Sequence, residues 1–202
     1  MRIVVLASGG VDSSLMMSLL KKEGNEIFPL FIDYGQLARE KEWISCQNLC
    51  HFLELEPFRM DISGFGKGVP SGITNSELDI EKNAFLPTRN LLFLTLGAAY
   101  GHVKSANVIA IGILANPIFP DQTPAFVQAA QNSISKALGT DTIIMAPLIS
   151  LDKRDTLRLA RKYRLPLNLT SSCHSNSKEP CGRCISCKER LAAEAYLANE
   201  KF

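Results

Sequence analysis

The chain has 202 residues, of which 46% are hydrophobic and 21% are charged, and its formal net charge is +2. This length and composition suit one globular α/β domain with at most a small appended module. The small net charge gives no support to direct nucleic-acid binding. The sequence contains no apolar run of about 18 residues or more, so it predicts no membrane span. The first apolar stretch is too short for a secretory signal, so we expect a cytoplasmic protein.

Apolar runs alternate with segments of helical periodicity along the chain. The predicted elements are strand 3–6, helix 13–22, strand 26–32, helix 38–53, strand 56–60, helix 90–101, strand 107–113, helix 126–138, strand 142–145 and helix 152–163. Residues 61–83 are rich in glycine and lack periodicity, which predicts a long mobile loop of the kind that serves as a lid. The alternation predicts a doubly wound parallel sheet that binds ligands at the carboxyl ends of its strands.

The segment Ser8-Gly9-Gly10-Val11-Asp12-Ser13 joins the first strand to the first helix. Glycines let backbone amides approach an anion closely, and the helix that follows directs its free N–H groups and positive dipole end at the same point. Neither Gly-Lys-Ser/Thr nor Gly-x-Gly-x-x-Gly is present, which disfavours the usual mononucleotide and dinucleotide loops. The pattern predicts a site for a pyrophosphate group, with Asp12 available for Mg²⁺ or as a helix cap.

Four cysteines near the C-terminus follow the pattern Cys173-x₇-Cys181-x₂-Cys184-x₂-Cys187. This spacing is typical of a structural zinc site with four thiolate ligands. An iron–sulfur cluster is the competing interpretation, and His174 is an alternative ligand. Cys46 and Cys50 lie four residues apart in a segment of helical periodicity, so we expect them on the packed face of a helix.

With these motifs the chain resembles the 7-cyano-7-deazaguanine synthase family of PP-loop adenine-nucleotide α-hydrolases. The resemblance spans about residues 1–195 and includes Asp33-Tyr34-Gly35-Gln36 after the second strand. Further matching segments are Phe85 to Leu94 around Pro87-Thr88-Arg89-Asn90, Phe119-Pro120-Asp121, Pro147-Leu148 and Asp152-Lys153.

The resemblance implies an ATP-dependent ligase that adenylates the carboxylate of 7-carboxy-7-deazaguanine. Ammonia then displaces AMP to give an amide, and a second adenylation permits dehydration to the nitrile. Magnesium accompanies ATP, a Cys₄ zinc is present, and family members commonly form homodimers. Residues 1–165 would form the PP-loop catalytic domain, and residues 166–202 would form the C-terminal zinc segment.

The same resemblance assigns roles to individual residues. Asp12, Arg89 and Lys153 would be catalytic. The residues expected to bind ATP are Ala7, Ser8, Gly9, Gly10, Val11, Asp12, Ser13, Ser14 and Asp33. The expected substrate pocket comprises Arg89, Phe119, Asp121 and Gln122, and the metal ligands would be Cys173, Cys181, Cys184 and Cys187.

The chain departs from the family pattern at two points. Thr88 stands where the family has glycine, and Gln122-Thr123 stands where it has Cys-Arg. The altered pocket motivates an alternative hypothesis, in which the enzyme stops at an amide formed with a different amine, from a protein or a small molecule. A nucleotide-binding module without catalysis is disfavoured by Asp12, Arg89 and Lys153. A tRNA-thiolating enzyme is disfavoured by the lack of a basic stripe and of a catalytic thiol near the site.

Overall fold

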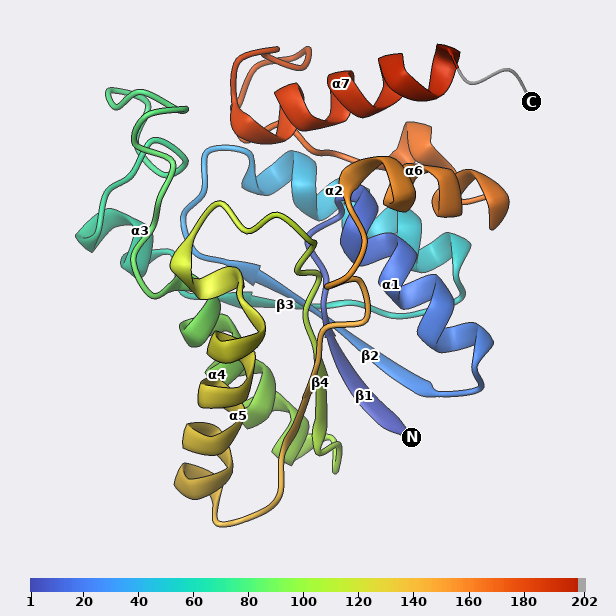
Figure 1. The fold of residues 1–202 in the computed structure, drawn as a ribbon. Coiled ribbons are helices and arrows are strands. Elements are labelled where there is room, and N and C mark those ends of the chain that lie inside the picture. Colours follow the sequence, from blue (N-terminus) through green and yellow to red (C-terminus); the bar gives the residue numbers. More distant parts are fainter. Residues whose placement is uncertain (200–202) are drawn as a thin grey trace.

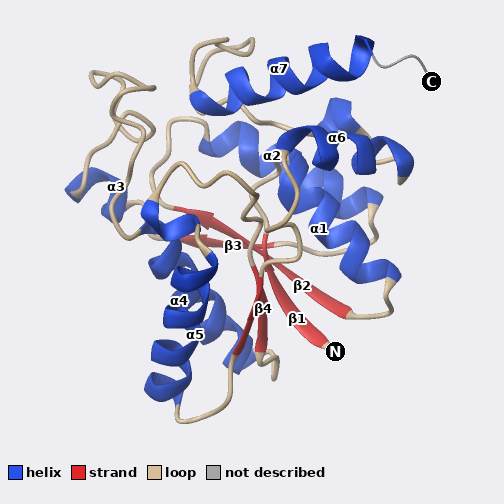
Figure 2. Cartoon of the chain, in the orientation of Figure 1, coloured by secondary structure: helices blue, strands red, loops and turns tan. Residues whose placement is uncertain are grey.

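The computed structural model describes residues 1–199, and its centre is a five-stranded sheet in which every paired strand is parallel (Figures 1 and 2). The strands are β1 (Arg2–Leu6), β2 (Glu26–Asp33), β3 (Phe58–Asp61), β4 (Val108–Ala110) and β5 (Ile143–Met145). Their spatial order is β3-β2-β1-β4-β5. The chain therefore reverses direction across the sheet after β3, and this creates a crevice at the carboxyl ends of β1 and β4.

Helices cover both faces of the sheet. They are α1 (Val11–Lys22), α2 (Arg39–Phe52), α3 (Gly64–Gly68), α4 (Arg89–Val103), α5 (Pro124–Leu138), α6 (Lys153–Lys162) and α7 (Ile185–Asn199). Alternate residues of β1 point to opposite faces. Ile3 and Val5 pack with apolar residues of α1, α2, α6 and α7, whereas Val4 and Leu6 pack with those of α4 and α5. The predicted doubly wound α/β fold is confirmed.

The predicted elements are present with small shifts at their ends. Helix α5 begins at Pro124, two residues earlier than expected, because the Thr123 hydroxyl accepts the N–H of Phe126 at 3.1 Å and caps the helix. Asp152 caps α6, accepting the N–H groups of Arg154 and Asp155. Cys46 and Cys50 lie fully buried on the inner face of α2, which confirms their assignment to the core.

Residues 61–83 differ from the expected open loop. They contain the short helix α3, and Ile73 and Ile80 in this segment are buried. Asp79 accepts the N–H groups of Glu81 and Lys82 through one oxygen, so a side chain closes the turn where regular secondary structure is absent. Gly66 and Gly72 allow close packing of this segment, because a Cβ atom would lie 2.3 Å from the carbonyl oxygen of Tyr34 at the first position and 2.2 Å from that of Asp79 at the second.

The C-terminal helix α7 is part of the same body. It packs along α6, and its residues Ala193 and Leu197 belong to the buried cluster that includes Ile3 and Val5. The division into residues 1–165 and 166–202 stays a prediction. Within the described residues, no helix combines the length and the apolar character needed to cross a bilayer.

Candidate active site and metal centre

The loop between β1 and α1 is a compact turn at the crevice. Gly9 has a φ of +74°, and the carbonyl of Gly10 accepts the Ser14 hydroxyl at 2.7 Å. The N–H of Ser8 donates to the Ser13 hydroxyl, and the carbonyl of Gly9 accepts the N–H of Ser171. These contacts hold the loop in a fixed shape at the N-terminus of α1, where free N–H groups favour an anion.

Two cavities adjoin this loop. The smaller, of about 250 Å³, lies against the loop and the ends of β1 and β2, and the larger, of about 560 Å³, lies between residues 112–122, α6 and α7. Six residues line both cavities: Asp12, Arg89, Gly112, Lys153, His174 and Ser186. We call these six residues the junction. Five of the residues predicted to bind ATP line only the smaller cavity: Ala7, Ser8, Gly10, Val11 and Ser13. Gly9 and Ser14 are not among the described residues that line it.

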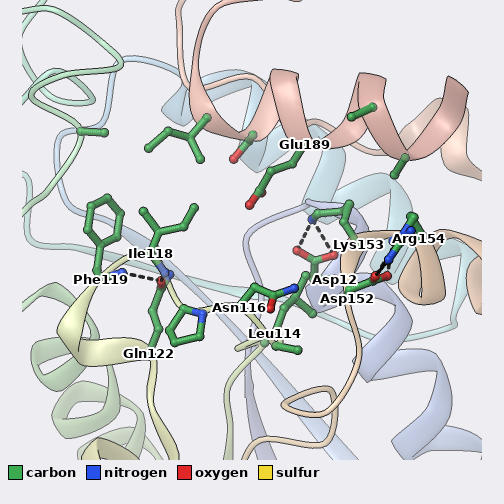
Figure 3. A pocket seen from close by; sticks show the side chains of 18 of the residues that line it. Asp12, Leu114, Asn116, Ile118, Phe119, Gln122, Asp152, Lys153, Arg154 and Glu189 are labelled. Atoms are coloured by element: carbon green, nitrogen blue, oxygen red, sulfur yellow. Dashed lines mark hydrogen bonds and ion pairs between the residues drawn. The ribbon is translucent and has the colours of Figure 1, made fainter. Parts of the chain in front are cut away.

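An ion pair spans the junction. The Nζ atom of Lys153 lies 2.6 and 2.8 Å from the two carboxylate oxygens of Asp12 (Figure 3). Asp12 stands in the first turn of α1 and Lys153 is the first residue of α6, so two helix N-termini converge here. The structure thus brings together two of the three residues predicted to be catalytic.

Arg89, the third of them, begins α4. Its guanidinium lies 5.9 Å from the centre of the Phe93 ring, and within the described part of the chain it forms no ion pair with a carboxylate. The Arg89 charge acts on the neighbouring Tyr34: burial raises the pKa of the Tyr34 hydroxyl to about 12, and Arg89 opposes this rise. A partly buried cation without a counter-ion is suited to receive an anionic ligand.

Asp33, predicted to bind ATP, has a protein partner in the structure. Its buried carboxylate pairs with Arg59 of β3 at 2.5 Å and accepts the N–H of Gly35. It is not among the described residues that line either cavity, although its neighbours Ile32 and Tyr34 are. Asp33 therefore fixes the turn after β2.

Besides Asp12, a second carboxylate lines the smaller cavity: that of Glu42, which the sequence analysis missed. It accepts a hydrogen bond of 2.9 Å from the Gln36 side chain, and burial raises its pKa to about 7. A signal was present in the sequence: Glu42, Cys46 and Leu49 are spaced by four and three residues, which places all three on the packed face of α2.

Glu42→Gln should make stability less dependent on pH. The ordinary pKa of 4.5 rises to about 7 in the folded protein, so the folded state holds a proton that the unfolded chain releases. This stabilising contribution is complete below pH 4.5 and is lost as the pH rises through about 7. Relative to wild type, the free energy of unfolding of the variant should be higher by about 1–3 kcal/mol at pH 8 and almost unchanged at pH 5. Urea unfolding at both pH values measures this, with the exposed Glu77→Gln as a control that should show no such trend.

The residues predicted to form the substrate pocket between positions 119 and 122 have two different roles. Phe119 and Gln122 line the larger cavity, and the Gln122 side-chain oxygen accepts the N–H groups of Ile118 and Phe119 at 2.9 and 3.0 Å (Figure 3). Asp121 lines neither cavity within the described structure. Its carboxylate accepts the N–H of Asn90 at 3.2 Å, and its carbonyl accepts the Asn90 amide at 2.9 Å.

These contacts make Asp121 a cap for α4. The residue at the N-cap position, Thr88, has a φ of +60°, and its hydroxyl donates to the carbonyl of Pro87, so it offers no acceptor to the helix. The carboxylate from the 3₁₀ turn η1 (Pro120–Gln122) replaces that acceptor. Asp121 thereby ties the acceptor segment to the helix that begins with Arg89.

Asp121→Ala should lower turnover by about 10-fold or more, because the first turn of α4 that carries Arg89 loses its cap. Loss of a cap should also cost about 1 kcal/mol of stability, and Asp121→Asn should keep most of both properties. Thr123→Ala removes the cap of α5 and is the matched control. Steady-state kinetics and thermal unfolding measure the effects; equal turnover in Asp121→Ala and Thr123→Ala would contradict this role.

The C-terminal segment contributes side chains to the larger cavity: Glu189 and Tyr196, which the sequence analysis did not assign, and His174, which it considered only as an alternative metal ligand. Glu189 points into it from α7, and burial raises the pKa of its carboxyl group (Figure 3). Tyr196 lines it farther along α7, under the Arg154 guanidinium. His174 lies at the junction, where burial, together with Arg89 and Lys153, lowers its pKa to about 4. The cysteine spacing in this segment predicts a metal site and gives no signal for these cavity-lining side chains.

The four cysteines converge. The sulfur atoms of Cys173, Cys181, Cys184 and Cys187 all lie within 4.8 Å of one another, and Cys184 is fully buried. Backbone N–H groups of Ser175 and Cys181 donate to the Cys173 sulfur at 3.4 and 3.3 Å, which favours the thiolate. A tetrahedral zinc–thiolate centre needs sulfur atoms roughly 3.8 Å apart. This group could hold a metal ion.

Comparison with known proteins decides the family. The family model of the queuosine biosynthesis protein QueC matches residues 2–198. The chain belongs to the QueC family. Relatives named 7-cyano-7-deazaguanine synthase include one from Nautilia profundicola, which is 32% identical with 94% of this chain and 91% of the relative covered, and one from Acetivibrio thermocellus, which is 35% identical with the same coverage.

Solved structures confirm the fold assigned to this QueC-family chain. The NMN synthetase of Francisella tularensis matches with a TM-score of 0.60 at 15% identity, covering 99% of this chain and 78% of that one. The NH3-dependent NAD synthetase of Campylobacter jejuni matches with a TM-score of 0.54 at 20% identity, covering 83% and 66%. At these identities the likeness concerns the fold alone.

Proposed function

We propose that this QueC-family chain is an ATP-dependent ligase that converts 7-carboxy-7-deazaguanine and ammonia into 7-cyano-7-deazaguanine. The observation that carries the proposal is the junction: two cavities of ligand size meet at Asp12, Arg89 and Lys153. The smaller cavity, against the glycine loop, suits the nucleotide. The larger cavity, lined by Phe119 and α7, suits the deazaguanine acid. The α-phosphate of the nucleotide and the carboxylate of the acid would then meet at the junction.

The first half of the reaction forms an acyl-adenylate. A carboxylate oxygen attacks the α-phosphorus, the bond from that phosphorus to the bridging oxygen breaks, and pyrophosphate departs toward the N-terminus of α1. The unpaired Arg89 and the nearby Lys153 are the cations available to stabilise negative charge on the phosphoryl oxygens. Asp12 is the carboxylate available for Mg²⁺, which when bound would neutralise phosphate charge.

The second half replaces AMP by nitrogen. Ammonia attacks the acyl carbon, AMP leaves with the bonding electrons, and loss of a proton gives the primary amide. A second ATP adenylates the amide oxygen, and loss of AMP and two protons gives the nitrile. Each nitrile therefore requires two ATP and yields two AMP and two pyrophosphates. We assign the four cysteines to a structural zinc ion: three of them are buried, Cys181 is half-buried, and four thiolates leave no open ligand position on the metal.

Purified protein given 7-carboxy-7-deazaguanine, ATP, Mg²⁺ and ammonium tests the proposal. Mass spectrometry should find the nitrile, with two AMP for each product. Accumulation of the amide alone, absence of turnover, or release of ADP and orthophosphate would contradict it.

Arg89→Met should lower kcat by about 10²–10³-fold, because the unpaired cation at the junction is lost. The exposed Arg161→Met, in the last turn of α6, is the matched control and should keep wild-type turnover. The same AMP-release assay measures both variants, and an Arg89→Met enzyme as fast as the control would remove Arg89 from the mechanism.

A further inference from the structure

His174 has an unused nitrogen at the junction. Its Nδ1 atom is the one side-chain nitrogen or oxygen that is buried without a hydrogen-bond partner among residues 1–199. The other ring nitrogen, Nε2, lies 3.0 Å from the Ser186 hydroxyl. Buried polar atoms in folded proteins are nearly always hydrogen-bonded, so an isolated exception that lines two cavities points to a partner supplied by a ligand.

The surroundings of the ring show which ligand atom it would meet. Arg89 and Lys153 are its charged neighbours, and both also line the two cavities. The space between two cations attracts an anionic oxygen, and such an oxygen accepts hydrogen bonds. If the Ser186 hydroxyl donates to Nε2, the ring proton resides on Nδ1, which is then available as a donor to such an anion.

The metal centre holds this ring in place. His174 follows Cys173 directly, and its backbone hydrogen-bonds to the sulfur of Cys184. Ser186 lies between Cys184 and Cys187 at the start of α7. Both members of the His174–Ser186 pair are therefore fixed in position by the cysteine cluster, while their side chains reach the junction.

We propose that His174 contacts the substrate, with its Nδ1–H donating a hydrogen bond to a non-bridging oxygen of the nucleotide α-phosphate during adenylation. Ser186 fixes the tautomer by donating to Nε2. The proposal rests on the proposed function, because it takes the nucleotide to lie in the smaller cavity with its α-phosphate at the junction. It gives the C-terminal segment a part in the reaction in addition to metal binding.

Two substitutions distinguish the role of the Nδ1–H donor of His174 from that of its aromatic ring. His174→Phe keeps an aromatic ring and removes the donor, and should lower kcat about 100-fold. His174→Asn places an amide N–H as many bonds from the backbone as Nδ1 is, and should keep at least a tenth of wild-type kcat. Metal content and unfolding temperature should match wild type in both variants. A metal-loaded His174→Phe with more than half of wild-type kcat, or a metal-loaded His174→Asn as slow as His174→Phe, would overturn the proposal.

A binding experiment on the wild-type protein gives a readout that is independent of turnover. The chain has three histidines, and the other two, His51 and His102, are exposed. Nitrogen NMR of ¹⁵N-histidine-labelled protein should show the signal of the protonated His174 Nδ1 shifting as this nitrogen gains a hydrogen bond when AMP saturates the site, while the signals of His51 and His102 stay unchanged. An unmoved His174 signal at saturation would overturn the proposal even if His174→Phe fails to fold. Failure of wild type to form nitrile would instead refute the proposed function.

Discussion

Replacing Gly9 with alanine is expected to abolish nucleotide binding and to destabilise the protein by about 2–5 kcal/mol. Gly9 has a φ of +74°, a conformation that costs an L-residue about 1–2 kcal/mol. A Cβ atom there would also lie 2.4 Å from the carbonyl oxygen of Glu42 and 2.8 Å from the backbone nitrogen of Cys46. These atoms belong to the backbone of α2, so relief requires moving the helix, at a further cost of about 1–3 kcal/mol.

Gly24→Ala is the control that separates backbone strain at a positive φ from steric collision of the added Cβ atom. Gly24 has a φ of +81°, but a Cβ atom there meets nothing within 4 Å. This control should lose only about 1 kcal/mol and should bind nucleotide as wild type does. Urea unfolding and titration with ATP measure both variants. If Gly9→Ala resembled Gly24→Ala in both properties, the close packing of the glycine loop on α2 would not be needed to shape the phosphate site.

The fold and the two motifs were predictable because their signals are local. Strand 3–6 is an unbroken apolar run, the helix after it has a regular apolar period, and the glycines between them mark the turn. The four cysteines reveal themselves by spacing alone, and the structure brings their sulfur atoms together. Each of these inferences needed only neighbouring residues, and the parallel sheet followed from their alternation.

The directions in which individual carboxylates point were not predictable. Asp33 and Asp121 both stand in segments that resemble the family, and the resemblance implied that both contact a ligand. In the structure Asp33 pairs with Arg59, 26 residues away, and Asp121 caps a helix at Asn90, 31 residues away. Such partners depend on how distant turns are juxtaposed, which periodicity does not encode. The His174–Ser186 pair was not predictable for the same reason, because the two residues are 12 positions apart in the sequence.

Removal of the metal from the cysteine cluster should weaken both the fold and the junction. Cys184→Ala deletes a fully buried member of the proposed ligand set, so the variant should lose the stoichiometric zinc that we expect in wild type. A ligand bound only by the folded state at 1,000 times its Kd stabilises by about 4 kcal/mol. In a domain of this size that loss corresponds to a fall in Tm of roughly 8–16 °C. Metal analysis and calorimetry measure these effects.

Turnover in Cys184→Ala should fall further than its stability explains, because the cluster positions the segment that carries His174, Ser186 and Glu189 into the cavities. Cys46→Ala is the matched control, since it removes another fully buried thiol that lies in α2, away from the cluster. The control should lose about 1–2 kcal/mol while keeping both its zinc and its kcat at temperatures where it is folded. A zinc-free Cys184→Ala that is folded and turns over at the rate of Cys46→Ala would show that the metal stabilises only the C-terminal segment and has no part in shaping the junction.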